Sequence, residues 1–219
     1  MKIGIIVAMQ SEFDQVESLK NADGCIGGKE VALALCGIGK VNAAISTMRM
    51  IDASAPDIIV STGIAGGANE KAAAVMDVVV GEQIAYHDVD CGPESKEGLG
   101  QVQGLPRIFK GDPALVDLAA QCGVDGVRVV RGLIATGDQF VSTVEAVSRI
   151  RSLYPNVAAV DMESAAIAHV CYLRGVKFLS MRVVSDIPGA VNQAAQYGNF
   201  WSLLGGRSFS ALREFLRRV

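Results

Sequence analysis

The chain has 219 residues, half of them apolar, and a formal net charge of -3. Its longest apolar runs, such as residues 177–184, are far shorter than the roughly 20 residues of a membrane-spanning helix, and its basic residues are too dispersed for a nucleic-acid surface. Nothing resembles a linker, so we expect one domain over residues 1–219.

Predicted strands and helices alternate along the chain. In order, we expect a strand at 2–9, a helix at 11–19, a hairpin within 24–37, a helix at 41–51, strands at 57–62 and 77–87, a helix at 113–122, a strand at 127–136, a helix at 142–151, a strand at 157–160, a helix at 163–174, a strand at 177–184 and a helix at 196–218. This alternation predicts an α/β layered domain, and the hairpin predicts a mixed sheet.

Cysteine and histidine usage bears on compartment and on metal binding. The five cysteines are scattered without a CxxC pair, which is typical of free thiols in a reducing compartment. Only His87 and His169 are present, and His169 lies on an apolar helix, so we predict no metal and no other cofactor. Acids at Glu12 and Asp14 exclude a signal peptide over the first residues, which predicts a cytoplasmic protein.

Residues 160–186 place two acids at opposite ends of a helix-then-strand unit. Glu163 precedes the mostly apolar run 165–171, and Asp186 follows the apolar strand that contains Arg182. A carboxylate at the mouth of a buried element is costly to desolvate unless it has a partner, so a ligand or a catalytic role is one explanation. A buried Arg-carboxylate pair that fixes the fold is the other, and the spacing alone leaves both open.

Two glycine-rich pieces differ in what they predict. GIGK at 37–40 lacks the spacing and the Ser or Thr of a phosphate-binding loop, so its glycines are interpreted as tight-turn residues. STGIAGG at 61–67 ends a buried strand, where consecutive glycines let a ligand approach the backbone closely.

Six segments together resemble one known family. They are IGIIVAMQSE at 3–12, CGIGKVNAA at 36–44, STGIAGG at 61–67, AYHDVD at 85–90, RGLIATGDQF at 131–140 and VDMESAAIAHVCYLRGVKFLSMRVVSD at 160–186. In order and approximate spacing these segments resemble the nucleoside phosphorylase and nucleosidase superfamily, in particular the 5'-methylthioadenosine/S-adenosylhomocysteine nucleosidases. The resemblance implies a three-layer αβα sandwich with a central mixed sheet.

The resemblance also implies roles for the polar residues. Asp186 corresponds to the acid that protonates N7 of the adenine, with Ser185 orienting it. Glu163 would accept hydrogen bonds from the ribose hydroxyls, and Glu12 would take a proton from the attacking water. Arg182 would hold that water or the ribose.

The remaining implied residues line the substrate pocket. Met162 would pack against the sugar, Phe140 would stack on adenine, and the backbone of Val141 would read the edge of the base. Tyr197 is a candidate for closing the pocket. The other implied substrate-binding residues are Met9, Ile64, Ala65 and Gly66.

Each of these residues also has an ordinary structural explanation. Glu12 fits a first-turn carboxylate favoured by the helix dipole, and Phe140 and Met162 fit ordinary core residues. Asp138 fits a turn or capping residue. Their joint occurrence favours the functional interpretation.

Two departures from the family pattern concern the substrate. Ile64 stands where typical nucleosidases have a Ser beside the reacting centre, which removes a hydroxyl that could hold water. Residues 91–104, the stretch that in the family reaches the 5' pocket of a neighbouring subunit, lack the usual aromatic side chains. The preferred 5' substituent is therefore left open.

The resemblance implies hydrolysis of 5'-methylthioadenosine and S-adenosylhomocysteine, with 5'-deoxyadenosine and aminodeoxyfutalosine as further substrates. A phosphate-dependent phosphorylase and a non-catalytic nucleoside-binding protein are the alternatives. Phosphorylases need cationic donors for the anion, whereas the first motif supplies Glu12. A homodimer is also implied, and the wide apolar stripe of the helix at 41–51 is its candidate interface.

Overall fold

The computed structural model describes residues 1–124, 126–204 and 209–219. Its strands are β1 (Ile3–Val7), β2 (Cys25–Ile26), β3 (Lys29–Leu35), β4 (Ile58–Gly67), β5 (Val78–Tyr86), β6 (Ile108–Lys110), β7 (Val129–Thr136), β8 (Val157–Asp161) and β9 (Lys177–Asp186). Its helices are α1 (Gln10–Glu17), α2 (Lys40–Ser54), α3 (Pro113–Ala119), α4 (Val144–Leu153), α5 (Ser164–Arg174), α6 (Gln193–Leu204) and α7 (Ser210–Arg218), with a 3₁₀ helix η1 (Gly92–Glu94).

The strands form a mixed sheet in which part of the pairing closes on itself. β3, β1, β4 and β9 are parallel neighbours, and β2 adds an antiparallel hairpin partner to β3. β9 also pairs antiparallel with β5, which leads through β7 and β8 back to the end of β4. β4 reaches both partners because its register shifts between Ala65 and Gly66. Irregularities of this kind bend a strand.

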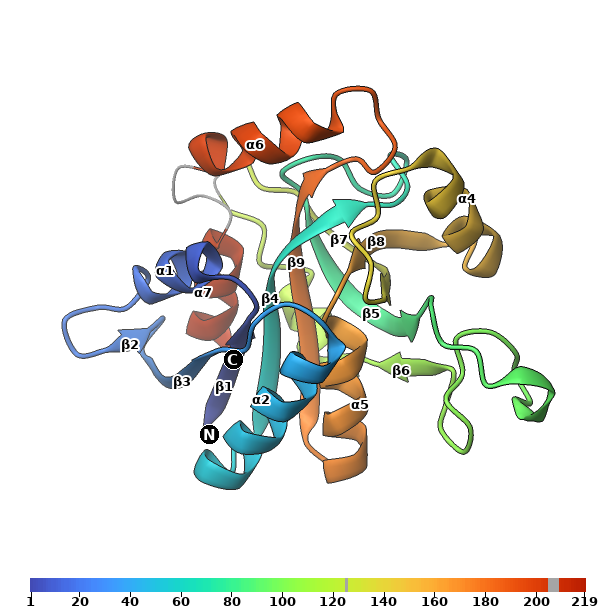
Figure 1. The fold of residues 1–219 in the computed structure, drawn as a ribbon. Coiled ribbons are helices and arrows are strands. Elements are labelled where there is room, and N and C mark those ends of the chain that lie inside the picture. Colours follow the sequence, from blue (N-terminus) through green and yellow to red (C-terminus); the bar gives the residue numbers. More distant parts are fainter. Residues whose placement is uncertain (125, 205–208) are drawn as a thin grey trace.

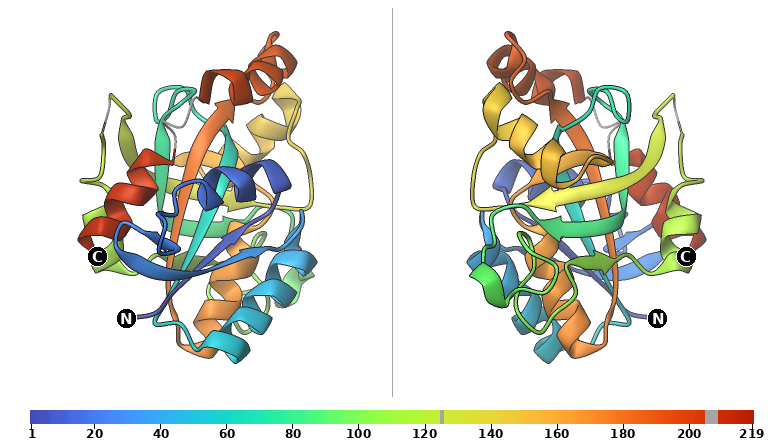
Figure 2. Two further views of the ribbon diagram at one scale, coloured as in Figure 1. Left: turned by 90° about the vertical axis from the view of Figure 1, so that its left-hand side faces the viewer. Right: turned by 90° about the vertical axis from the view of Figure 1, so that its right-hand side faces the viewer.

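Helices cover the sheet in separate layers, as the mixed-sheet sandwich predicts. Ile5 faces a core completed by α1, α3 and α7, whereas its neighbour Ile6 faces a core completed by α2 and α5. Alternate side chains of a strand point to opposite faces, so one strand serves both cores. Figures 1 and 2 show α2 beside α5, and α6 lying across the end of β9.

Two sequence predictions need correction. The strand β6 was not predicted, because three residues are too few to show an alternating pattern. The predicted helix at 196–218 is wrong: α6 packs on β9, whereas α7 packs against α3 and β2. Residues 205–208 of that prediction lie outside the described residues. Phe209 is the N-cap residue of α7 and is not part of a helix, with φ of -92° and ψ of 5°.

The other predicted elements are present, with ends shifted by a few residues. β4 and β9 extend beyond the predictions, to Gly67 and Asp186, and these extensions carry candidate site residues. α5 begins at Ser164, so Glu163 is its N-cap residue. Within the described residues, no helix combines the length and apolar character needed to cross a membrane.

Candidate active site

A cavity opens where the ends of β1, β4, β8 and β9 meet the start of α1, the loop before α4 and one side of α6. It combines carboxyl groups with apolar and aromatic side chains. The residues lining it are Ala8, Met9, Glu12, Ile38, Ile64, Ala65, Gly66, Gln139, Phe140, Val141, Val160, Asp161, Met162, Glu163, Ser185, Asp186 and Tyr197.

Glu12 lies in the first turn of α1, and its buried side chain points back toward the backbone just before the helix. Its Oε2 accepts hydrogen bonds from the backbone N–H groups of Ala8 (2.9 Å) and Met9 (3.0 Å). Its Oε1 accepts one from the N–H of Ile64 at 2.9 Å, which joins α1 to the loop end of β4. Three backbone donors therefore hold both oxygens in place. Oε2 accepts two of these hydrogen bonds, whereas Oε1 accepts one and keeps further acceptor capacity.

Gly63 explains how Glu12 and Arg182 can approach the β4 backbone so closely. A Cβ at this position would lie 2.4 Å from Oε1 of Glu12 and 2.8 Å from Nη1 of Arg182. The φ of Gly63 is +141°, a conformation that L side chains rarely adopt. The glycine-rich strand end therefore admits protein side chains to the backbone, and Gly66 lines the cavity itself.

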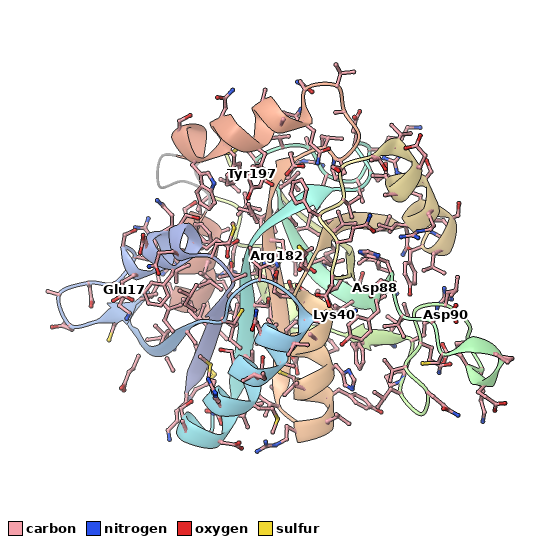
Figure 3. The ribbon with its side chains drawn as sticks, in the orientation of Figure 1. Glu17, Lys40, Asp88, Asp90, Arg182 and Tyr197 are labelled. Carbon is pink, nitrogen blue, oxygen red and sulfur yellow. The ribbon has the colours of Figure 1, made fainter. Side chains whose placement is uncertain are left out.

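Arg182 is 1% exposed and lies behind the cavity wall. Its Nε is 2.9 Å from Oδ2 of Asp161, and its Nη2 is 3.6 Å from Oε2 of Glu163. Nη2 also donates to Oγ of Ser61 at 2.9 Å, and Nε to Oγ of Ser164 at 3.2 Å. Figure 3 shows its position in the middle of the sheet. The buried Arg-carboxylate pair left open by the sequence is therefore present, with Asp161 as its closest carboxylate.

Glu163 connects this ion pair to the cavity. Its Oε1 accepts a hydrogen bond from the backbone N–H of Gly39 at 3.0 Å, across 124 residues of sequence. Burial and the neighbouring charge of Asp161 raise the pKa of Glu163 to about 7, against the opposing effects of Arg182 and the Gly39 amide. The GIGK turn thus supports a site carboxylate instead of a phosphate.

Asp186 is 2% exposed at the end of β9 and has a hydrogen-bond donor on each oxygen. The hydroxyl of Ser185 donates to Oδ1, and Nε2 of Gln193 donates to Oδ2 at 2.8 Å. Burial raises the pKa of Asp186, and the two donors oppose that rise. A carboxyl group whose pKa is raised by burial is suited to supply a proton.

An aromatic and sulfur-containing wall closes one side of the cavity. The rings of Phe140 and Tyr197 meet edge to face, with centroids 5.7 Å apart, and the Tyr197 hydroxyl is 3.9 Å from Sδ of Met9. Phe140 is 57% exposed, so it is not a core residue. A flat, partly exposed ring in a cavity wall offers a face on which a planar base can stack.

The loop carrying Phe140 is held by a cluster of charges outside the cavity. Nζ of Lys40 is 2.7 Å from Oδ2 of Asp88, and the same oxygen accepts a hydrogen bond from the N–H of Asp138. Oδ1 of Asp138 caps α2 by accepting from the N–H of Lys40 at 2.8 Å. Figure 3 shows Lys40 and Asp88 facing one another beside the site. Asp138 is therefore a capping residue, as its position predicts, although the helix it caps is distant in sequence.

The structure gathers most of the predicted site residues around one cavity. Glu12, Glu163, Asp186 and the nine predicted substrate-binding residues line it. Arg182 does not line the cavity, but it pairs with Asp161 and Glu163, which both do. No residue of the 91–104 stretch lines the cavity of its own chain.

Sequence reasoning missed several residues that shape the site. Asp161 precedes Glu163 by two positions and could have been suspected from that spacing, but nothing local pairs it with Arg182. Gln193 contacts Asp186 from a polar segment that carries no motif. Ala8, Ile38, Gln139 and Val160 also line the cavity; they lie within the motif segments, but no role was predicted for them. In the described part of the chain, no group of three or more His, Cys, Asp or Glu side chains could hold a metal ion.

Comparisons with known proteins identify the family. Residues 2–217 match the family model of the Phosphorylase superfamily. A 5'-methylthioadenosine/S-adenosylhomocysteine nucleosidase of Bacillus cytotoxicus is 41% identical over 203 residues, covering 86% of this chain and 87% of the relative. The solved structure of the Neisseria meningitidis nucleosidase of that name, in complex with methylthio-immucillin-A, matches with a TM-score of 0.90 and 34% identity over 100% of this chain and 99% of the other. Futalosine hydrolase of Helicobacter pylori matches with a TM-score of 0.87 and 26% identity, over 100% and 98% of the two chains.

Proposed function

Because this chain belongs to the 5'-methylthioadenosine/S-adenosylhomocysteine nucleosidases of the phosphorylase superfamily, we propose that it hydrolyses the N-glycosidic bond of these two nucleosides and releases adenine. The observation that carries the proposal is the convergence of Glu12, Glu163 and Asp186 on one cavity with a stacking wall. An oxocarbenium-like transition state favours carboxylates near the sugar and a carboxylic acid near the leaving group.

Each carboxyl group has a separate role in the proposed reaction. Water attacks C1' of the ribose and loses a proton to Glu12, while the bond from C1' to N9 breaks and its electron pair moves into the base. Protonated Asp186 gives its proton to N7, so adenine leaves as a neutral molecule. Ionised Glu163 accepts hydrogen bonds from the ribose hydroxyls, and these strengthen as positive charge develops on the sugar. Arg182 positions Glu163 from behind.

Water is favoured over phosphate as the nucleophile by the charges around the cavity. Among the described residues that line it, none is Arg or Lys. The Arg182 guanidinium is engaged with Asp161 and Glu163. A phosphate ion would need cationic or multiple polar donors, whereas a carboxylate at Glu12 would repel it.

Adenine release from 5'-methylthioadenosine, with and without phosphate, tests the proposal when the sugar product is identified by chromatography. We expect phosphate-independent release of free methylthioribose. A sugar 1-phosphate formed only with phosphate would show that the protein is a phosphorylase. Binding without turnover would support the non-catalytic alternative, for which Ile64 is the motivating departure.

The raised pKa of Glu163 predicts how substrate binding depends on pH. If only ionised Glu163 accepts both ribose hydroxyls well, the affinity for an unreactive methylthioadenosine analogue should weaken as the pH falls through about 7, by up to about tenfold per pH unit. Adenine lacks the ribose and serves as the control, because protonation of Asp186 affects both ligands. Isothermal titration calorimetry of both measures the ratio of affinities, and an unchanged ratio would contradict the role of Glu163.

Unfolding would not explain that loss of affinity. The pKa of Glu163 in the folded protein lies above its ordinary value of 4.5, so the folded state binds this proton more tightly than the unfolded state. The contribution of Glu163 to stability is therefore present below pH 4.5 and is lost as the pH rises through about 7. Thermal unfolding at each pH checks the sign.

We further propose a homodimer, supported by an apolar surface on two neighbouring helices. Val41, Ile45 and Met48 of α2 are 69%, 45% and 37% exposed, and Tyr172 and Leu173 of α5 are 58% and 62% exposed. Such a surface is typical of protein interfaces. Light scattering at micromolar concentration should give twice the mass of one chain, and an Ile45→Asp variant should be monomeric; a wild-type monomer would reject the dimer. We expect the protein to act in the cytoplasm as one domain.

A further inference from the structure

Gln193 connects three parts of the site without lining the cavity. It is the first residue of α6 and is 7% exposed. Its Nε2 donates to Oδ2 of Asp186 at 2.8 Å and to the backbone oxygen of Val141 at 3.0 Å. Its Oε1 accepts a hydrogen bond from the N–H of Gly189 at 2.9 Å.

These partners determine which way the side-chain amide points. Two oxygen acceptors lie on one side of the amide and a backbone N–H lies on the other, so only one of its two orientations satisfies all three. With both amide hydrogens and the amide oxygen engaged, the group has no better alternative arrangement. A buried, fully paired amide holds its partners firmly, because leaving any of them unpaired would cost free energy.

Both acceptors of Gln193 belong to residues that we expect to contact adenine, Asp186 in the proposed reaction and Val141 by the family resemblance. Asp186 supplies the proton to N7, and the Val141 backbone reads the edge of the base that carries the 6-amino group. N7 and the 6-amino group are neighbours on adenine, so the acid and the carbonyl must keep a set separation. One amide that donates to both enforces this separation.

We propose that Gln193 is a positioning residue for the general acid. It holds the Asp186 carboxyl group where it can reach N7, at a fixed separation from the Val141 carbonyl. The inference rests on the proposed function, since it assigns Gln193 a role through Asp186. It predicts that loss of Gln193 slows reactions that require a proton on the leaving group and spares those that do not.

A purely structural role makes a different prediction. Gln193 also anchors the start of α6 to residue 189, and losing an anchor would disturb the whole wall, including Tyr197. Gln196 offers a matched control on the same helix: its Oε1 accepts a hydrogen bond from the N–H of Ile187 at 2.9 Å. It therefore ties α6 to the same loop without a hydrogen bond to Asp186.

The experiment compares Gln193→Met with Gln196→Met, using wild type and Asp186→Asn as references. The two substrates are 5'-methylthioadenosine and 4-nitrophenyl 5-methylthio-β-D-riboside, whose nitrophenolate leaves without a proton. For Gln193→Met we expect kcat on the nucleoside to fall about ten- to a hundredfold, as for a misplaced catalytic group. On the nitrophenyl substrate kcat should stay within about threefold, and Gln196→Met should stay within about threefold on both.

The outcomes separate this inference from the proposed function. Wild type that releases no adenine overturns both. If Asp186→Asn loses only the nucleoside reaction, the assignment of Asp186 as the general acid is supported. If Gln193→Met then loses both reactions equally, or behaves like Gln196→Met, the positioning role of Gln193 is overturned. If Gln193→Met does not fold, as judged by thermal unfolding, Gln193→Asn replaces it, because the shorter side chain draws the donor away from Asp186. For Gln193→Asn we expect the same selective loss of kcat on the nucleoside. The same change in kcat, relative to wild type, on both substrates would overturn the inference.

Discussion

A Glu12→Gln variant is expected to lower kcat for adenine release by about 10²- to 10⁴-fold, the usual contribution of a general base. The side chain keeps its size but can no longer take a proton from water. Adenine affinity should remain close to wild type, because the predicted base-binding residues Phe140 and Val141 come from the loop before α4, whereas Glu12 belongs to α1. Steady-state kinetics and calorimetry with adenine measure the two quantities.

Glu17→Gln is the matched control for that variant. Glu17 lies at the other end of α1, where its exposed carboxylate pairs with Lys20 at 2.7 Å, so its loss should leave kcat unchanged. Glu12→Gln should also lower the free energy of unfolding by about 1–3 kcal/mol, because a single amide oxygen cannot accept all three backbone donors. A kcat within tenfold of wild type in the folded variant would show that another group activates the water.

An Arg182→Met variant is expected to lower the free energy of unfolding by about 3–5 kcal/mol, the cost of breaking a buried ion pair from one side. Methionine fills part of the space but leaves Asp161 and Glu163 facing one another without a cation. Burial raises the pKa of Glu163 even though Arg182 lowers it. Without Arg182, Glu163 should therefore become protonated and substrate binding should weaken. Urea unfolding measures the loss of stability.

Arg131→Met provides the comparison on the surface. Nη2 of Arg131 lies 2.8 Å from Oδ1 of Asp117, but the two side chains are 41% and 63% exposed. Water replaces such a pair at little cost, so the free energy of unfolding should fall by only about 0–1 kcal/mol. Similar losses in the two Arg variants would show that the buried network contributes no more than an exposed pair.

The strands and helices were largely predictable because their signals are local. Alternation and helical spacing are properties of neighbouring residues, and they predicted β1, β5 and α5 to within a few positions. The failures have identifiable causes. β6 is too short to show a pattern, and the helix predicted at 196–218 includes Phe209, which is the non-helical N-cap residue of α7.

The candidate carboxylates were also named from sequence, because motif order and the placement of charges at strand ends are visible in one dimension. The partner of Arg182 could not be predicted from the sequence. Either a ligand or a carboxylate could satisfy a buried guanidinium, and only the fold shows that Asp161 lies 2.9 Å away and that Arg182 does not line the cavity.

The sequence by itself determined the alternation of elements, the family, and the choice of three candidate acids that the structure places around one cavity. Tertiary structure decided which groups hold those acids: the backbone N–H of Ile64 for Glu12, the backbone N–H of Gly39 for Glu163 and the side-chain amide of Gln193 for Asp186. The register shift in β4 and its pairing with both β8 and β9 likewise belong to the tertiary structure. The physical reason is sequence separation, since a hydrogen bond such as the one from Gly39 to Glu163 joins residues 124 positions apart and leaves no periodic trace in the chain.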